Sequence, residues 1–253
     1  MQGSSIVVVG SGTSLIGSKL GDFIDQQDAV LRFGGGETCL PKVYENREDV
    51  GEKTTHLIQN FNLAALRRFS KRVEQQAGFY FNLQQILLVH RGSHNVVANC
   101  IALKNYNKFI RGQIDTEIID ITAYVEREIK NYSGWLCSDS TKPLFEGDNN
   151  STSGFFAILR LINSNKFDKI YLCGFDNLFE DVPIEDKPYH FYGSEFETEF
   201  GHNLYNESRL VLALKKHISK IKILYTKEPF PDAGKIEVGN LINGKFQIKV
   251  ISC

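Results

Sequence analysis

Short apolar runs recur along this chain between polar, glycine-containing segments, and they constrain its fold more than any other feature. Continuous apolar runs of this length are typical of parallel strands buried on both faces. They predict strands at 6–9, 29–32, 56–59, 85–90, 169–173 and 221–225. Helical spacing predicts helices after Leu15 and at 63–76, 119–130, 154–161 and 203–217. This alternation predicts an α/β fold, a Rossmann-like domain with a mostly parallel sheet and helices on both faces.

The length and the end of the chain add two expectations. A chain of 253 residues is long enough for one well-packed domain and does not demand a second. We therefore expect residues 1–253 to form a single domain. Asn243-Gly244 stands between two apolar runs, which predicts a hairpin turn.

The charge and the cysteines exclude several classes of partner and site. The net charge is −1, so no basic excess indicates a nucleic acid partner. The five cysteines form no CxxC pair, which argues against a zinc or redox motif and favours a reducing compartment. We expect no leader, because only five residues precede the first apolar run, and no apolar run reaches membrane-spanning length (~20 residues). We therefore expect a cytoplasmic protein, with a peripheral contact at the inner membrane as the alternative.

The first predicted strand runs directly into a glycine turn, Gly10-Ser11-Gly12, before the next helix. Glycines allow a ligand to approach the backbone, and a helix N-terminus offers unpaired amides to an anion. Ser11, Thr13 and Ser14 add hydroxyl donors. The dinucleotide pattern GxGxxG is not met. A phosphate or nucleotide seat and a tight turn without a ligand both remain open from these residues alone.

The turn belongs to a longer pattern. Val8–Leu15 is followed by Gly17-Ser18, by 24–32 (IDQQDAVLR) and by 49–55 (DVGEKTT). In order and spacing these segments resemble the long sialylmotif of animal-type sialyltransferases, glycosyltransferase family 29. That motif runs V-V-G-N-S-G-x-L-x-G-S, then I-D-x-H-D-x-V-L-R, then D-V-G-x-K-T-T.

The later motifs of that family follow in the same order. Residues 151–155 (STSGF) open an apolar helix and 169–175 (KIYLCGF) end a strand, which resembles the short sialylmotif. Residues 190–193 (HFYG) resemble the third motif, and His202 with Glu207 matches the last, H-x-x-x-x-E. The resemblance implies a variant GT-A-like sialyltransferase fold for the single domain. It also implies acceptor-side loops near 92–115 and 178–200.

The chain departs from the family pattern where the donor would bind. Ser11 replaces the asparagine of the first turn, and Gly34-Gly35-Gly36 stands where a second asparagine is expected. Ile6 and Phe167 stand where the family disulfide would join the two large motifs. The resemblance therefore implies a bacterial-type member that makes surface glycans. Its donor would be CMP-sialic acid or a CMP-activated relative such as Kdo.

The resemblance also implies an activity and its residues. An inverting, metal-independent transferase without a cofactor would move the acidic sugar from a CMP-sugar to a glycan or lipid-linked glycan acceptor. His202 would be the base for the acceptor hydroxyl and His190 would stabilise the leaving phosphate. Glu207 would orient the His202 ring or stabilise the start of a helix. The expected donor-binding residues are Gly10, Ser11, Gly12, Thr13, Ser14, Arg32, Gly34, Thr152, Ser153, Gly154, Phe175 and Tyr192.

Two other functions remain open at this stage. An NADP-binding oxidoreductase could use the same glycine turn, with Arg32 reading the 2′-phosphate, but it would explain none of the later motifs. A non-catalytic module that binds a nucleotide or a glycan could keep the motifs without turnover.

Overall fold

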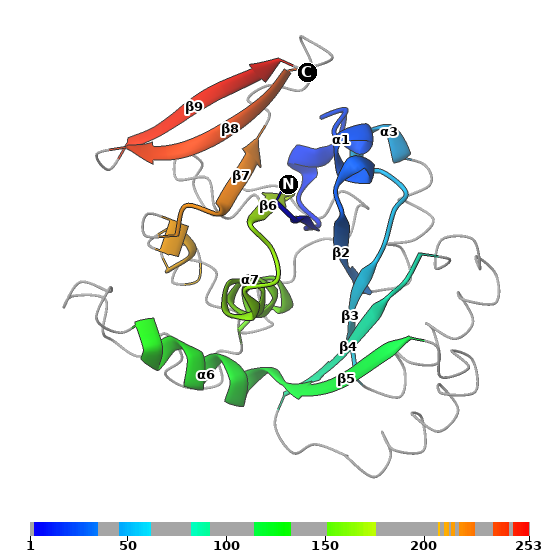
Figure 1. Cartoon of the computed structure of the whole chain (residues 1–253), viewed down its shortest axis with the longest axis vertical. Helices are drawn as coiled ribbons and strands as arrows, with labels where there is room; N and C mark the ends of the chain where they lie inside the picture. Colours follow the sequence, from blue (N-terminus) through cyan, green and yellow to red (C-terminus); the bar gives the residue numbers. More distant parts are fainter. Residues whose placement is uncertain are drawn as a thin grey trace.

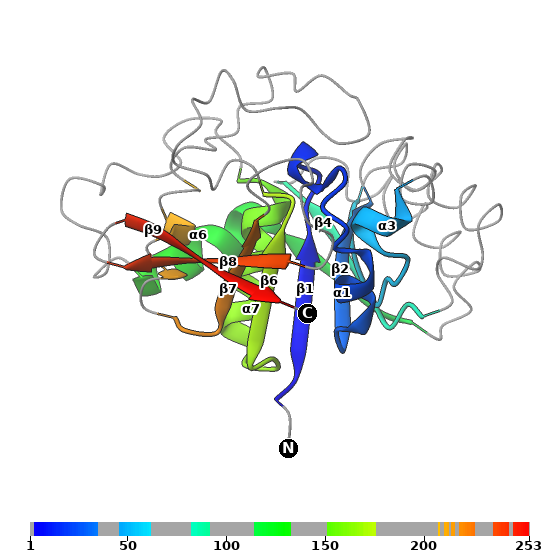
Figure 2. The same ribbon diagram turned by 90° about the horizontal axis from the view of Figure 1, so that it is seen from above.

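The computed structural model of this chain describes a large sheet with helices on both of its faces (Figures 1 and 2). The described residues are 3–34, 46–61, 82–91, 114–132, 151–175, 207, 210–212, 214–215, 218–225, 235–242 and 245–252. Within them, no helix is long and apolar enough to span a membrane.

Across the described residues, the sheet has nine strands in the order β5-β4-β3-β2-β1-β6-β7-β8-β9. The first seven in this order are parallel, whereas β8 and β9 are antiparallel additions at one edge. The strands are β1 (Ser5–Val9), β2 (Ala29–Gly34), β3 (His56–Asn60), β4 (Gln85–His90), β5 (Asp115–Asp120), β6 (Lys169–Cys173), β7 (Ile221–Tyr225), β8 (Lys235–Ile242) and β9 (Lys245–Ser252).

The continuous apolar runs form the centre of the sheet because both of its faces are covered. Along β1, Ile6 and Val8 belong to one buried cluster, while Val7 and Val9 belong to the other. All four side chains are at most 4% exposed. Burying a side chain of this size stabilises the fold by about 1.5–3 kcal/mol, so neither face of the strand tolerates a polar residue.

Different helices cover the two faces (Figure 1). The short helices α1 (Gly21–Gln26) and α3 (Arg47–Val50) contribute Ile24 and Val50 to the cluster that contains Val7. The longer helices α6 (Ile121–Tyr132) and α7 (Ser153–Ser164) contribute to the cluster that contains Ile6. The prediction of a mostly parallel sheet with helices on both faces is therefore confirmed.

The chain reverses its direction of growth at β1. It adds β2 to β5 on one side of β1 and then returns to place β6 on the other side. In open α/β sheets, such a reversal leaves a crevice at the carboxyl ends of the two central strands, where ligands bind. The strand order therefore directs attention to the residues after Val9 and after Cys173.

Several elements have the predicted limits. β4, β6 and β7 cover the predicted residues, and the antiparallel strands β8 and β9 flank residues 243–244, as the hairpin prediction requires. Among residues 203–217, positions 207, 210–212, 214 and 215 are described and helical. The predicted helix at 63–76 and the loop at 178–200 lie outside the described residues, as does all of the loop at 92–115 except positions 114 and 115.

Two sequence predictions were wrong. The helix expected at 119–130 begins only at Ile121, because residues 115–120 pair with β4 along its whole length as β5. The helix expected directly after Leu15 does not form there. A 3-10 turn, Thr13–Leu15, ends at that residue, and α1 starts only at Gly21. Positive φ angles at Gly17 and Lys19 interrupt the helix, and the Asp49 carboxylate accepts hydrogen bonds from both of their amides.

Candidate functional site

The carboxyl ends of β1 and β6 are joined through their backbones. The Gly10 amide donates to the Cys173 carbonyl at 2.8 Å, and the Gly12 amide donates to the Gly174 carbonyl at 2.8 Å. A Cβ on Gly10 would lie 2.2 Å from the Gly174 carbonyl oxygen, so this approach requires glycine at position 10. The predicted glycine turn is thus held against the end of β6.

The remainder of this turn is anchored by Leu15. Its side chain is 1% exposed and contacts Gly174, whose φ of +69° places it in the left-handed region. Ser11 and Ser14 are half-buried beside it. For Thr13 only the backbone is described. The turn therefore presents its backbone and its serines at a fixed position.

The start of α7 lies at the same edge of the sheet. Thr152 is the N-cap residue, and its Oγ1 accepts a hydrogen bond from the Phe155 amide at 3.0 Å. The Ser153 and Gly154 amides precede the first hydrogen bond within the helix, from Phe156 to Thr152. An anion placed before these amides would also benefit from the helix dipole.

Phe175 connects the three segments. A Cβ on Gly10 would lie 3.2 Å from its ring, and a Cβ on Gly154 would lie 2.9 Å from its ring. The ring also meets Phe33 of β2 edge to face, with centroids 6.5 Å apart. The predicted residues Gly10, Gly154 and Phe175 are therefore brought together by the structure, with Gly34 beside Phe33.

Glu207 binds the N-cap residue of α7 through both of its carboxylate oxygens. One carboxylate oxygen accepts the Thr152 amide and the other accepts the Thr152 hydroxyl, each at 2.6 Å. Glu207 is 2% exposed. Burial raises its pKa to about 7, against the lowering effect of the Thr152 hydrogen bonds and of Arg91. Thr152 and Glu207, which were predicted for separate roles, are in direct contact.

Arg91 completes this polar cluster from the end of β4. Its Nη2 donates to the Ser151 carbonyl at 3.0 Å, and its charge lies close enough to Glu207 for each to shift the other's pKa. Burial lowers the Arg91 pKa, whereas Glu207 raises it. The Arg91 Nε and the Ser151 Oγ are buried and have no hydrogen-bond partner among the described residues.

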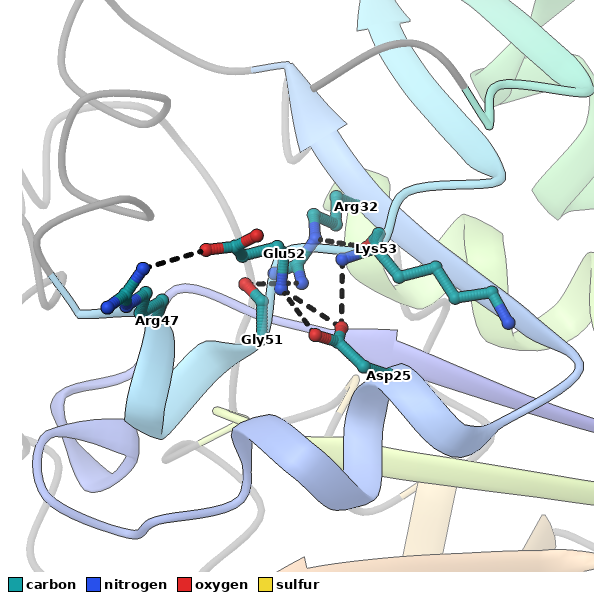
Figure 3. A network of polar contacts seen from close by, with 6 residues as sticks. All are labelled: Asp25, Arg32, Arg47, Gly51, Glu52 and Lys53. Atoms are coloured by element: carbon teal, nitrogen blue, oxygen red, sulfur yellow. Dashed lines mark hydrogen bonds and ion pairs between the residues drawn. The ribbon is translucent and has the colours of Figure 1, made fainter. Parts of the chain in front are cut away.

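Arg32, which was predicted to bind the donor, is buried in a network of backbone hydrogen bonds. It is 5% exposed, and its Nε and Nη2 donate to the carbonyls of Lys53 and Gly51 (Figure 3). The Nη2 atom also donates to the Val50 carbonyl. The Asp25 carboxylate accepts the amides of Glu52 and Lys53 in the same network. The contacts of Arg32 are architectural, and they join the two later segments of the long motif.

The remaining predicted residues are Ser153, which lies in the first turn of α7, and His190, Tyr192 and His202, which lie outside the described residues. Sequence reasoning did not identify Arg91 or Ser151 as part of the site. For Arg91 the available signal was position alone, since it directly follows a predicted parallel strand. Ser151 is the first residue of the segment that resembles the short sialylmotif, and that was its signal.

The described residues contain no group of three or more His, Cys, Asp or Glu side chains that could hold a metal ion. A cavity of ≈ 230 Å³ lies elsewhere, at the opposite ends of the strands, where His56 begins β3 and Gln85 begins β4. Its lining shares no residue with the cluster around Thr152, so the glycine turn and the α7 start remain the candidate site.

Comparison with known proteins gives a family. The family model described as glycosyltransferase family 29 (sialyltransferase) matches residues 4–219. Among curated proteins, none matches this chain. Two solved structures of a mammalian sialyltransferase are similar to it, one of them in complex with Gal-beta-1-3GalNAc-ortho-nitrophenol. They are 17% and 19% identical, cover 90% of this chain and 71% of theirs, and have TM-scores of 0.49.

Proposed function

This chain belongs to glycosyltransferase family 29, the sialyltransferases, and from that premise we propose that it transfers an acidic sugar from a CMP-sugar to a glycan hydroxyl. Sialic acid is the donor sugar that the family name indicates, and Kdo is the alternative left open by Ser11 and by Gly34-Gly35-Gly36. The acceptor is a glycan or a lipid-linked glycan.

The observation that carries this proposal is the capped start of α7 beside the glycine turn, at the carboxyl ends of β1 and β6. In the proposed complex, the Ser153 and Gly154 amides face the CMP phosphate, and the bare backbone of Gly10 and Gly12 lets the nucleotide approach. Phe175 forms the apolar floor between them. These are the elements that a phosphate-bearing donor needs at this position.

The proposed reaction is an inverting in-line displacement. His202 takes the proton of the acceptor hydroxyl as that oxygen forms its bond to the anomeric carbon. The bond from this carbon to the CMP phosphate breaks, and the phosphate keeps the electron pair. His190 and the α7 amides stabilise the resulting charge. The roles of His190 and His202 rest on the motifs that contain them.

Glu207 has a more definite role. Both of its oxygens already accept hydrogen bonds from Thr152, so the contacts favour the second of its expected roles, that of stabilising a helix start. We propose that Glu207 is a positioning residue, which fixes the amides of α7 before the donor arrives. Preorganised donors of this kind cost no rearrangement during the reaction.

We propose that neither a metal nor a cofactor is needed, because α7 amides and His190 would supply the positive charge facing the phosphate. Activity measured in EDTA and with added Mg²⁺ or Mn²⁺ tests this point. Equal rates are expected, and a loss of activity in EDTA that a cation restores would overturn it.

The direct test measures CMP release from CMP-sialic acid and from CMP-Kdo, with and without a galactose-terminated acceptor. Acceptor-dependent release is expected with one donor. His202→Ala should abolish release and keep CMP affinity, while His94→Ala, outside all of the motifs, is the matched control. Binding of CMP without any release would instead identify a non-catalytic module.

The oxidoreductase alternative loses the residue on which it depended. Arg32 would have had to read the 2′-phosphate of NADP, but its side chain is buried and donates to backbone carbonyls. A thermal-shift titration separates the two functions, because stabilisation by CMP and not by NADP is expected.

A further inference from the structure

The α7 start is held by two opposite charges from distant parts of the chain. Glu207 accepts the amide and the hydroxyl of Thr152, while Arg91 donates to the carbonyl of the preceding residue, Ser151. Ser151 is 4% exposed and Glu207 is 2% exposed, so solvent does not compete for these bonds. The peptide group between residues 151 and 152 is therefore hydrogen-bonded at both ends, its oxygen to Arg91 and its N–H to Glu207.

We propose that Arg91 is a positioning residue of the donor site, which holds the Ser151 carbonyl and balances the buried Glu207 carboxylate so that the α7 amides stay aligned. This inference rests on the proposed function, because it assigns those amides to the CMP phosphate. Arg91 itself does not touch the donor in this proposal.

The positive charge on Arg91 matters because Glu207 must be ionised to accept both hydrogen bonds from Thr152. An ionised carboxylate accepts both Thr152 hydrogen bonds, whereas a protonated carboxyl group carries a donor and would face the Thr152 amide or hydroxyl with it. Burial raises the Glu207 pKa, and the nearby Arg91 charge lowers it. Without that charge, more of Glu207 would be protonated near neutral pH and the cap would loosen.

The hydrogen bonds of Arg91 also differ from those of Arg32, the arginine within β2. The Arg91 Nε and the Ser151 Oγ are buried without hydrogen-bond partners among the described residues, although buried polar atoms are rarely left unpaired. By contrast, both Nε and Nη2 of Arg32 have carbonyl partners. Among the described residues, the hydrogen bond of Arg91 therefore goes to the α7 start, whereas those of Arg32 go to the scaffold.

The test compares the wild-type enzyme with Arg91→Met, Arg91→Lys and the double variant Arg91→Met/Glu207→Gln. Calorimetric titration measures the Kd of CMP, initial rates give the KM of donor and acceptor separately, and thermal melts report folding. Arg47→Met is the matched control, because that arginine is exposed and pairs only with exposed Glu52 among the described residues.

For Arg91→Met, we expect the Kd of CMP and the KM of the donor to rise by roughly tenfold to a hundredfold, because small misplacements of a binding group have effects of this size. The KM of the acceptor should be unchanged. Arg91→Lys keeps the charge and should recover most of the affinity. The double variant removes both charges, so it should be folded even if Arg91→Met is not, with CMP binding still weaker than in the wild type.

The results separate this inference from the proposed function. If the wild type binds CMP and the folded Arg91 variants bind it equally well, Arg91 is only structural and the inference is wrong. If the wild type itself does not bind CMP, the proposed function fails and the inference falls with it. An equal rise in the KM of donor and acceptor would also contradict a role confined to the donor amides.

Discussion

Two arginines of the same sheet, Arg32 within β2 and Arg91 just after β4, are used in different ways. Arg32, on β2, donates to backbone carbonyls of the turn at 50–53 and is 5% exposed. Arg91, directly after β4, donates to the Ser151 carbonyl and lies near the Glu207 carboxylate, and its Nε has no partner among the residues that the structure describes. The comparison separates a residue that builds the scaffold from one that supports the site.

The segments of the long motif differ in the same way, because belonging to one motif does not give them one role. The later segments of the long motif, around Asp25, Arg32 and Gly51, bind one another (Figure 3). The first segment instead binds the end of β6, through the Gly10 and Gly12 amides. Mutations should therefore divide into those that unfold the protein and those that weaken donor binding.

The largest effect is expected for Arg32→Met. The substitution leaves buried carbonyls of Val50, Gly51 and Lys53 without their donor, which should cost roughly 3–5 kcal/mol of unfolding free energy. Urea denaturation measures this loss. CMP affinity at a temperature where the variant is folded should equal that of the wild type, and selective loss of CMP binding in a fully stable variant would reverse the assignment of Arg32.

Glu207→Gln should change how stability depends on pH. Burial raises the folded-state pKa of Glu207 to about 7 from an ordinary value of 4.5, because its cost to the ionised form outweighs the Thr152 hydrogen bonds. The stability gained by protonating Glu207 in the folded state is therefore full below about pH 4.5 and is lost as the pH rises through 7. Relative to the variant, the wild type should lose roughly 1.4 kcal/mol for each unit of pKa difference. Unfolding free energies at pH 4.5 and pH 8 test this, and a constant difference would contradict it.

A matched threonine pair sharpens the same comparison. Thr55 Oγ1 binds the backbone of Val30 in the scaffold, whereas Thr152 Oγ1 caps α7 in the site. Thr55→Val and Thr152→Val should each cost roughly 1–2 kcal/mol of stability. Only Thr152→Val should also weaken CMP binding, by about tenfold, which corresponds to about 1.4 kcal/mol. Equal CMP affinities for the two variants would remove the distinction.

The smallest effect is expected for Arg47→Met. The Arg47 Nη1 lies 3.6 Å from Glu52 Oε1, and the two side chains are 70% and 50% exposed. Surface ion pairs of this kind contribute about 0–1 kcal/mol. Melts of the variant at low and high salt should nearly coincide with those of the wild type, and a large loss would mean that this pair supports the Arg32 turn.

Much of the candidate site could be predicted because its residues lie in continuous motifs. Gly10, Thr152, Gly154 and Phe175 each occupy a strand end or a helix start, and the structure brings all of them to one edge. Arg91 could not be predicted in this way, since its partner Ser151 is 60 positions away in the chain. Arg32 was predicted as a donor ligand because its position in the motif does not reveal which way its side chain points.

The sequence by itself determined the alternation of buried strands and helices, the glycine turn at Gly10 and the helix start at 151–155, because hydrophobic period and local backbone preference act over a few neighbouring residues. Only the tertiary structure decided that residues 115–120 form a strand, that Arg32 serves the scaffold, and that Arg91 and Glu207 meet around α7. Those outcomes depend on strand pairing and on buried charge, and both arise only when distant segments come together.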